Sequence, residues 1–279
     1  MSDQAGRLRT RVSARRARVI TITSGKGGVG KTTLVANLGL EIARLGRRVL
    51  LLDGDLGLAN LAILFNQAPR RTLEDALAGR CPLEEVVLAV RDGLAVLPAA
   101  AGVARLAELS DHERRPLLGE IARLGAEHDL LIIDTGAGIG TTVQELVGLA
   151  DRVFLVTTHE PTALSDAYGL LKAVRRPAGG PRIEIVVNLA QTHAQARETH
   201  SRLIRLTERF MGFTPGLAAV IPRDEAVGQA IARQEPLTRI YPYAPATRAI
   251  AALARLLVDT RGTDHALTSD TPLALSIRR

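Results

Sequence analysis

The chain has 279 residues, a hydrophobic fraction of 46% and a formal net charge of +7. These values allow one large domain with a sizeable core and exclude a chain that is disordered throughout. The single cysteine, Cys81, excludes an internal disulfide and a cysteine-ligated zinc or iron–sulfur centre, and no apolar run approaches the about 20 residues of a membrane-spanning helix.

Apolar, strand-like runs alternate with helical segments along the chain, which is typical of parallel βαβ units. Several runs are apolar throughout, as expected for strands that helices cover on both faces. Strands are predicted at Val19–Ser24, Arg48–Asp53, Gly93–Leu97, Leu130–Asp134, Val153–Thr158, Ile183–Asn188 and Leu217–Ile221. Helices are predicted at about 31–45, 111–126, 141–150, 162–175, 194–211, 223–234 and 245–259. The sequence therefore predicts an α/β fold over residues 19–260, a single doubly wound, mostly parallel sheet, followed by a polar tail at 261–279.

The positive charge is concentrated at the N-terminus. Residues 1–18 contain six arginines and one aspartate, so this segment carries +5 and residues 19–279 carry only +2. We expect a basic, flexible arm and a nearly neutral folded domain, so binding to DNA is not expected. The arm lacks the apolar segment of a secretory leader, and the expected location is the cytoplasm.

A glycine-rich segment follows the first predicted strand and opens the first predicted helix. It satisfies G-x-x-x-x-G-K-[ST], with Gly25 first and Gly30, Lys31 and Thr32 last. Backbone N–H groups can converge on phosphate oxygens there, and the helix N-terminus adds partial positive charge. Lys31 is expected to bridge the β- and γ-phosphates of ATP, and the Thr32 hydroxyl to coordinate Mg²⁺. The predicted ATP contacts are Gly25, Lys26, Gly27, Gly28, Val29, Gly30, Lys31, Thr32 and Thr33; a tight turn without a ligand is the alternative.

Lysine is rare in this chain, and its positions point to phosphate chemistry. Among 36 basic residues only Lys26, Lys31 and Lys172 are lysines, and two of them lie in the glycine-rich segment. The form K-G-G-x-G-K-T-T resembles the deviant phosphate loop of the MinD/ParA ATPases. The resemblance implies that Lys26 reaches the nucleotide of a second subunit, so that ATP joins two protomers as a homodimer. Lys26 and Lys31 are then both catalytic; a solvated loop lysine is the alternative for Lys26.

Acidic residues end two of the buried predicted strands. Asp53 and Asp55 follow Val49–Leu52, and Asp134 follows Leu130–Ile133. Because ligands gather at the carboxyl ends of parallel strands, these acids are expected beside the phosphate loop. The resemblance implies that Asp53 supports the metal and that Asp55 orients or activates the attacking water. Capping of the following helix is the alternative for Asp53 and Asp55.

Asp134 also begins a candidate switch. It is expected to contact Mg²⁺ through water, and Gly138 would let the segment 134–138 respond to the γ-phosphate. Proteins of the MinD type commonly have proline where Gly136 stands, so the sequence departs from their pattern there. The aspartate and the last glycine of the switch are nevertheless in place.

Two further residues are assigned to the adenine base by the resemblance. Asn188 ends an apolar strand at the place where the family has an adenine-binding asparagine, and Pro222 lies in the second segment that flanks the base. A turn-forming asparagine and a proline at a helix start are the alternatives.

Within the family, the sequence resembles the FlhG (FleN) branch of flagellar regulators. The stretches DGDLGLANL at 53–61 and DTGAGI at 134–139 support this branch, as does Leu164–Tyr168. In the arm, Asp3, Gln4, Ala5, Leu8 and Arg9 match the D-Q-A-x-x-L-R element through which such proteins stimulate the GTPase FlhF.

The resemblance implies an ATPase that converts ATP and water to ADP and phosphate slowly, and that regulates the number and placement of flagella. Its implied partners are an FlhF-type GTPase, flagellar switch-complex proteins and a flagellar transcription activator. The C-terminal tail is only a weak candidate for reversible contact with the inner membrane face. The alternatives are a ParA-like partition ATPase that binds DNA non-specifically and a MinD-like regulator of the division site.

Overall fold

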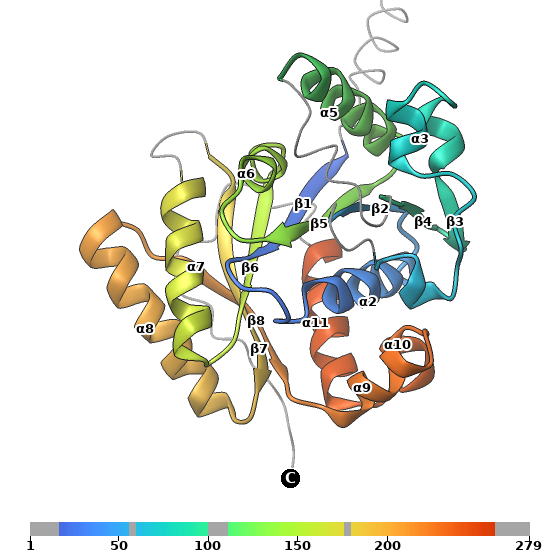
Figure 1. Cartoon of the computed structure of the whole chain (residues 1–279). Coiled ribbons are helices and arrows are strands. Elements are labelled where there is room, and N and C mark those ends of the chain that lie inside the picture. Colours follow the sequence, from blue (N-terminus) through green and yellow to red (C-terminus); the bar gives the residue numbers. More distant parts are fainter. Residues whose placement is uncertain (1–16, 56–59, 100–110, 176–179, 260–279) are drawn as a thin grey trace, which may run out of the picture.

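The computed structural model describes residues 17–55, 60–99, 111–175 and 180–259. They form an eight-stranded sheet in the order β3-β4-β2-β5-β1-β6-β7-β8, with helices on both faces (Figure 1). Neighbouring strands are parallel except β3 and β4.

The strands are β1 (Arg18–Ser24), β2 (Val49–Gly54), β3 (Leu88–Arg91), β4 (Leu94–Leu97), β5 (Leu130–Ala137), β6 (Arg152–Thr157), β7 (Arg182–Ala190) and β8 (Gly216–Pro222). The helices are α2 (Lys31–Arg44), η1 (Ile63–Phe65), α3 (Leu73–Leu77), η2 (Leu83–Val86), α5 (Asp111–Ala126), α6 (Thr141–Gly148), α7 (Pro161–Val174), α8 (His193–Met211), α9 (Glu225–Ala232), α10 (Leu237–Ile240) and α11 (Pro245–Asp259).

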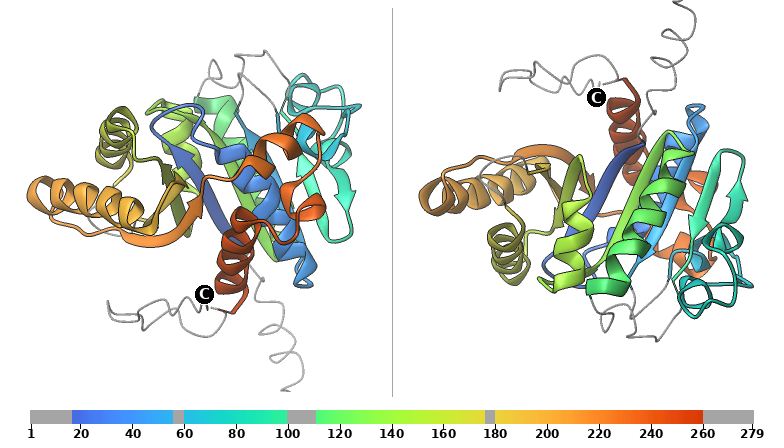
Figure 2. Two further views of the ribbon diagram at one scale, coloured as in Figure 1. Left: turned by 90° about the horizontal axis from the view of Figure 1, so that it is seen from below. Right: turned by 90° about the horizontal axis from the view of Figure 1, so that it is seen from above.

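Alternate residues of each central strand enter different cores. On one face, Ile20 and Ile22 of β1 pack in a cluster with α2 and α11, which α9 and α10 extend. On the other face, Val19 packs in a cluster with α5, and the side chains of β6 and β7 pack with α6, α7 and α8. The two views of Figure 2 show these groups of helices on opposite sides of the sheet. The apolar runs of β1, β2 and β6 are therefore buried almost throughout, as predicted for parallel strands.

The predicted doubly wound fold is confirmed, and its predicted strands and helices are all present. Their ends lie within two residues of the prediction, except that β5 continues to Ala137. β1 begins at Arg18, one residue inside the expected arm. The backbone N–H of Arg18 donates to the Asp129 carbonyl at 3.3 Å, and its guanidinium donates to the Leu257 carbonyl at 3.1 Å. These bonds attach Arg18 to the folded domain.

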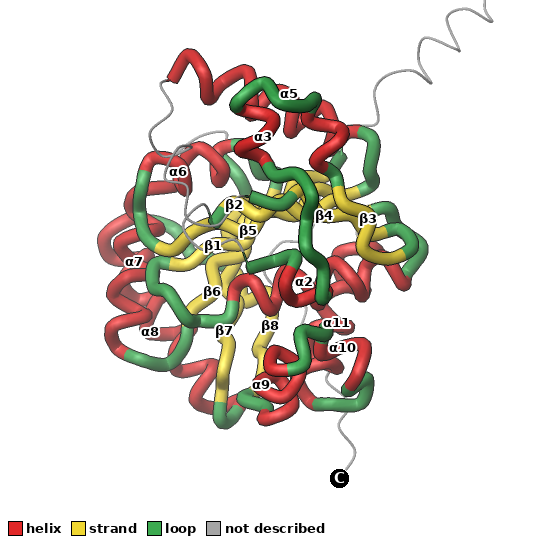
Figure 3. The backbone as a smooth tube through the Cα atoms, turned by 45° about the vertical axis from the view of Figure 1, so that its right-hand side comes forward, coloured by secondary structure: helices red, strands yellow, loops and turns green. Residues whose placement is uncertain are grey.

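The prediction misses the edge strand β3, which pairs with β4 as an antiparallel hairpin. Figure 3 shows β3 and β4 beside each other at one edge of the sheet. The hairpin turns at Asp92-Gly93, and Gly93 has a φ of 74°, a conformation that glycine adopts without strain. β3 is four residues long and only Val90 within it is buried, so its apolar pattern is weak.

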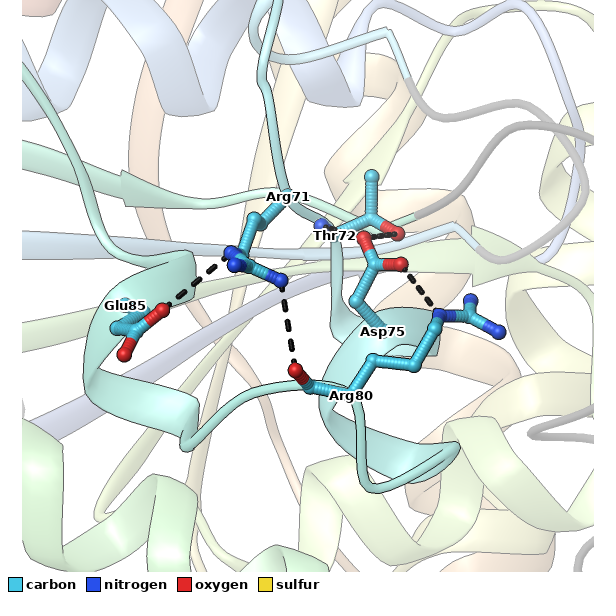
Figure 4. A network of polar contacts seen from close by, with 5 residues as sticks. All are labelled: Arg71, Thr72, Asp75, Arg80 and Glu85. Carbon is cyan, nitrogen blue, oxygen red and sulfur yellow. Dashed lines mark hydrogen bonds and ion pairs between the residues drawn. The ribbon is translucent and has the colours of Figure 1, made fainter.

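The short helix α3 is also missed, and local polar contacts define its start. The Thr72 backbone N–H donates to Asp75 Oδ2 at 2.8 Å, and Arg80 Nε donates to Asp75 Oδ1 at 2.8 Å (Figure 4). In the same network Arg71 forms an ion pair with Glu85 at 3.3 Å. These contacts connect α3 with the segment that leads to η2.

Candidate functional site

The glycine-rich loop lies between the end of β1 at Ser24 and the start of α2 at Lys31. Gly25 leaves no room for a side chain, because a Cβ atom there would lie 2.2 Å from the backbone carbonyl of Asp166 in α7. Gly30 has a φ of 90°, and a Cβ atom on it would lie 2.5 Å from Asn188 Nδ2. The two glycines therefore fix the loop against α7 on one side and β7 on the other.

Lys31 occupies the first turn of α2, at the end of the helix where backbone N–H groups are free to bind an anion. Its side chain is buried, and burial lowers the pKa of its ammonium group, although the carboxylates of Asp134 and Asp55 oppose that shift. Thr32, the next residue, has its hydroxyl beside Asp134. The loop, the lysine and the helix end together form a cradle suited to phosphate groups.

The acids of β2 and β5 meet in register at the same edge of the sheet. Asp53 pairs with Asp134 and Gly54 with Thr135 across the two parallel strands. β2 and β5 approach each other so closely here that position 54 requires glycine, because a Cβ atom there would lie 2.6 Å from the Asp134 carbonyl oxygen. Two carboxylates are thus held side by side in a buried position.

The two carboxylates differ in how they are satisfied. Asp53 accepts the backbone N–H of Leu61 at 3.0 Å and that of Asp55 at 3.3 Å. Among the described residues, by contrast, no donor forms a hydrogen bond with either carboxylate oxygen of Asp134. Burial raises the pKa of both groups to about 7. For Asp134 the Thr32 hydroxyl and the Lys31 ammonium oppose this rise without cancelling it.

This chemistry fits a divalent cation with a hydrated shell. An unpartnered buried carboxylate costs free energy unless a cation or hydrogen-bond donors compensate it. Mg²⁺ prefers oxygen ligands and keeps several waters, so one or two carboxylates beside a phosphate site suffice to hold it. Among the described residues, no group of three or more His, Cys, Asp or Glu side chains forms a metal cage of its own. Thr32, Asp53 and Asp134 are the residues that could hold the ion.

Asp55 and Gly138 follow the two acids in the sequence and lie at the same edge of the sheet. The Gly138 N–H donates to the Ser24 carbonyl at 3.0 Å, and Gly138 has a φ of 100°, so the end of the switch is attached to the start of the phosphate loop. A Cβ atom on Gly136 would lie 3.8 Å from Asp55 Oδ1, which puts the Asp55 carboxylate next to the switch. The structure therefore brings both predicted residues to the site, although residues 56–59 lie outside the described part.

Lys26 is held by the start of α7. Its ammonium donates to Glu160 Oε2 at 2.6 Å and to Thr162 Oγ1 at 3.0 Å. The ion pair is accessible, with the Lys26 and Glu160 side chains 36% and 53% exposed, and the Lys26 bond lowers the pKa of Glu160. The sequence analysis misses Glu160 and Thr162 as site residues. Their position in the sequence could have identified them, because they follow β6, and that strand ends at the same edge of the sheet as the phosphate loop.

Asn188 and Pro222 lie at the ends of β7 and β8. The Asn188 amide donates from Nδ2 to the Val29 carbonyl at 2.7 Å, and its Oδ1 accepts the Leu189 N–H at 2.9 Å. Pro222 pairs with Ala190 of β7. Asn188 is therefore brought against the phosphate loop, whereas contact of either residue with adenine stays a prediction.

Several predicted features lie outside the described residues. These are the partner motif formed by Asp3, Gln4, Ala5, Leu8 and Arg9, and the tail at 261–279. None of the helices in the described ranges has the length and apolar character needed to cross a membrane. The partner motif and the membrane contact remain predictions.

Comparisons with known proteins agree with this geometry. Residues 20–237 match the model of the CobQ/CobB/MinD/ParA nucleotide binding domain. The chain is 40% identical over 237 residues to the antiactivator FleN of Pseudomonas aeruginosa, covering 85% of each protein. It is 33% identical over 189 residues to the flagellum site-determining protein YlxH of Helicobacter pylori, covering 68% of this chain and 64% of that protein. Among solved structures, the septum site-determining protein MinD of Pyrococcus horikoshii in complex with Mg-ADP matches with a TM-score of 0.71 and 26% identity, over 86% of this chain and 96% of that one.

Proposed function

We propose that the protein is an ATP-dependent switch that regulates flagella, because this chain belongs to the CobQ/CobB/MinD/ParA nucleotide-binding family. The observation that carries the proposal is the Asp134 carboxylate, which is buried beside Lys31 and Thr32 and accepts no hydrogen bond from the part of the chain that the structure describes. Mg²⁺ with its bound water would supply the missing charge and the missing donors. The ligand is therefore Mg²⁺–ATP, bound at the carboxyl edge of the sheet.

Each residue of the site has a defined role in this proposal. Thr32, Asp53 and Asp134 hold Mg²⁺ directly or through water, and the bound ion neutralises charge on the phosphates. Lys31, which is buried beside two carboxylates, contacts the β- and γ-phosphates. Asp55 orients or activates the water that attacks the γ-phosphate, so that ATP is hydrolysed slowly to ADP and phosphate.

Lys26 couples ATP binding to association with a second protomer. In a single chain it pairs with Glu160, and an ion pair this accessible to water is weak, so Lys26 can leave it readily. In the proposed homodimer Lys26 leaves Glu160 and contacts the triphosphate of the facing protomer. ATP then stabilises the dimer relative to the monomer, and hydrolysis resets the switch.

The flagellar assignment is supported by relatives and by motifs together. FleN is named an antiactivator and YlxH a flagellum site-determining protein, and both are similar to most of this chain. The proposed partners are an FlhF-type GTPase bound through the motif in the arm, flagellar switch-complex proteins and a flagellar transcription activator. A weak, reversible contact with the membrane would accompany the dimer.

The test is stimulation of an FlhF-type GTPase by the full chain and by a chain that lacks residues 1–16. We expect both proteins to bind ATP, because all the proposed ATP contacts follow residue 16 in the sequence, but only the full chain to stimulate GTP hydrolysis. Lys31→Ala is the matched control, since it keeps the arm and removes the phosphate contact. Unchanged stimulation after the arm is deleted would contradict the flagellar assignment, and failure of the full chain to bind ATP would contradict the whole proposal.

A further inference from the structure

A groove lies on the surface of the domain between α3 and η2 on one side and α5 on the other. Figures 1 and 3 show α3 and α5 beside each other. The groove has a volume of about 520 Å³, and none of the described residues that line it belongs to the nucleotide site. We call it the α3–α5 groove, and its apolar lining includes Leu77, Cys81, Pro82, Pro116 and Leu117.

The floor of the groove is the outer side of a core cluster. Leu117 is buried in the cluster that Val19 of β1 also joins. Leu77 and Cys81 pack against this cluster but are only half-buried. Half-buried apolar side chains gain free energy when another apolar side chain covers them, because their remaining surface is then removed from water. The groove therefore offers both room and a surface for apolar anchors.

The rim of the groove is acidic. Arg123 forms ion pairs with Glu84 and, at 3.4 Å, with Glu127. Glu84 most strongly, and then Glu127 and Glu120, raise the pKa of the Arg123 guanidinium, so one cation lies among three carboxylates. Residues 71–86 and 111–127 together contain eight acids and five arginines, a net charge of −3, whereas residues 19–279 carry +2. Such a surface attracts cations and repels phosphate groups, so neither a nucleic acid nor an anionic membrane fits it.

The arm of the same chain has the composition that complements this groove. Residues 1–16 contain five arginines and one aspartate, so their side chains carry +4. Ala5, Leu8 and Val12 are spaced i, i+3 and i+7, which would place them on one face of a helix with most arginines elsewhere. The arm therefore supplies apolar anchors for the floor and cations for the rim.

The arm also begins at the right place. The Arg18 backbone N–H donates to the Asp129 carbonyl at 3.3 Å, three residues beyond the end of α5 at Ala126. The nine residues of α5 from Leu117 to Ala126 cover about 14 Å, whereas the ten residues from Leu8 to Arg18 reach up to about 33 Å when extended. The tether thus spans the distance along α5, and a short tether keeps the local concentration of the arm near the mM range.

We propose that residues 5–16 dock in the α3–α5 groove of their own chain, with Leu8 and Val12 on the apolar floor and arginines against Glu84 and Glu120. This contact needs neither nucleotide nor a partner, so it goes beyond the proposed function. It has one consequence for that function. Leu8 also belongs to the motif proposed for the GTPase, so the GTPase binds the arm only when the arm leaves the groove.

The single cysteine of the chain, Cys81, lines the groove and reports whether it is covered. The experiment measures, by mass spectrometry, the rate at which excess N-ethylmaleimide modifies Cys81 in the full chain without nucleotide or partner. The wild type is compared with Leu8→Asp/Val12→Asp. Thr10→Asp/Ser13→Asp is the matched control, since it makes the same change of charge at positions on the other side of a helical arm.

The groove is tested by making the same arm variants in two further backgrounds. One is Glu84→Lys/Glu120→Lys at the rim, and the other is Glu198→Lys/Glu208→Lys, which makes the same change of charge at two exposed glutamates of α8. Each arm variant is compared with the unchanged arm in the same background, so the direct effect of the lysines on the thiol cancels.

We expect Leu8→Asp/Val12→Asp to speed the modification of Cys81 about fivefold, as for a groove that is covered about four-fifths of the time, and the Thr10/Ser13 control to change it less than about twofold. The α8 background should show the same acceleration as the wild type, and the Glu84/Glu120 background none. The acceleration should not depend on protein concentration, because the arm and the groove belong to one chain.

Equal rates for the wild type and Leu8→Asp/Val12→Asp would overturn the proposal, and so would equal acceleration by the two arm variants. Acceleration that persists in the Glu84/Glu120 background would place the arm elsewhere, and protection that disappears on dilution would assign the groove to the arm of a second copy; either result also overturns it. Equal melting temperatures show that the variants are folded. Failure of the chain to bind ATP would contradict the proposed function but would leave this measurement unchanged, so the two failures are distinguishable.

Discussion

Two buried pairs of charged side chains lie in the same sheet, and they are built in opposite ways. At the carboxyl ends of β2 and β5, Asp53 and Asp134 have like charges, and no described residue forms a hydrogen bond with the Asp134 carboxylate. Near the amino ends of β6 and β7, Arg152 and Glu184 have opposite charges and form a bidentate pair, with Nη2 of Arg152 2.9 Å from Oε1 of Glu184. All four side chains are nearly inaccessible.

The difference separates a ligand site from a structural contact. A buried charge is tolerated when an opposite charge and hydrogen bonds compensate it, as the guanidinium of Arg152 does for Glu184. At the Asp53–Asp134 pair, the backbone N–H groups of Leu61 and Asp55 compensate Asp53, whereas within the described residues Asp134 accepts no hydrogen bond, so we expect a ligand to complete its compensation. Strongly shifted pKa values in such a position are typical of functional sites.

The largest effect on stability is expected where the satisfied pair is broken. Arg152→Met leaves Glu184 buried, with only the exposed Arg182 nearby at 3.2 Å, and should lower the free energy of unfolding by about 3–5 kcal/mol. Denaturant unfolding measures this loss. The double variant Arg152→Met/Glu184→Met should recover much of it, because no buried charge remains. A loss below about 1 kcal/mol for the single variant, the value typical of an exposed pair, would contradict this interpretation.

An effect of opposite sign is expected at the unsatisfied pair. The raised pKa of Asp134, about 7, means that its neutral form stabilises the fold below the ordinary pKa of 3.8, and that this stability is lost as the pH rises through 7. Asp134→Asn removes the charge, so without Mg²⁺ and nucleotide it should raise the melting temperature above that of the wild type at pH 8. A gain on the order of 2–4 kcal/mol is expected there, and a much smaller one at pH 4.

The same substitution should reverse its effect when the ligand is present. Mg²⁺ and an ATP analogue are expected to raise the melting temperature of the wild type but not of Asp134→Asn, because the variant lacks the carboxylate for the ion. Thermal unfolding at both pH values, with and without ligand, measures the four cases. If the variant is less stable than the wild type without ligand at pH 8, the account of an uncompensated charge is wrong.

The smallest effect is expected in the exposed network of Figure 4. The Thr72 N–H and Arg80 lower the pKa of Asp75, so its charge stabilises the fold above the ordinary pKa and that stability is lost as the pH falls through the lowered value. Asp75→Asn should therefore lower the melting temperature slightly at pH 7 and not at pH 2. Glu74→Gln is the matched control, since it removes the same charge from the first turn of α3 without a hydrogen bond. An equal decrease in both variants would show that helix-end charge, rather than the hydrogen bonds, is responsible.

Much of the fold and the centre of the site could be predicted from the sequence, because both depend on local patterns. Buried strands such as β2 are continuous apolar runs, and the acids that end them necessarily reach the edge where the phosphate loop begins. Two missed elements also carry local signals. The Asp92-Gly93 turn favours a hairpin before β4, and the spacing of Thr72 and Asp75 favours a helix start at α3.

The remaining features depend on how distant segments meet, which a sequence pattern does not specify. The Lys26–Glu160 pair joins residues 134 positions apart, and the Asn188–Val29 bond joins residues 159 positions apart. The same holds for the pKa values of Asp53 and Asp134, because they are raised by burial that arises only when β2, β5 and the helices pack together.

The central claim is that ATP brings two copies of this chain together through Lys26. Its most direct test is the molar mass from size-exclusion chromatography with light scattering, for the wild type and Lys26→Ala, with Mg²⁺ and a non-hydrolysable ATP analogue or without nucleotide. The account predicts a wild-type dimer only when the analogue is present, and a Lys26→Ala protein that binds the analogue but stays monomeric. A wild type of the same mass in both conditions, or a Lys26→Ala protein that dimerises like the wild type, would contradict it.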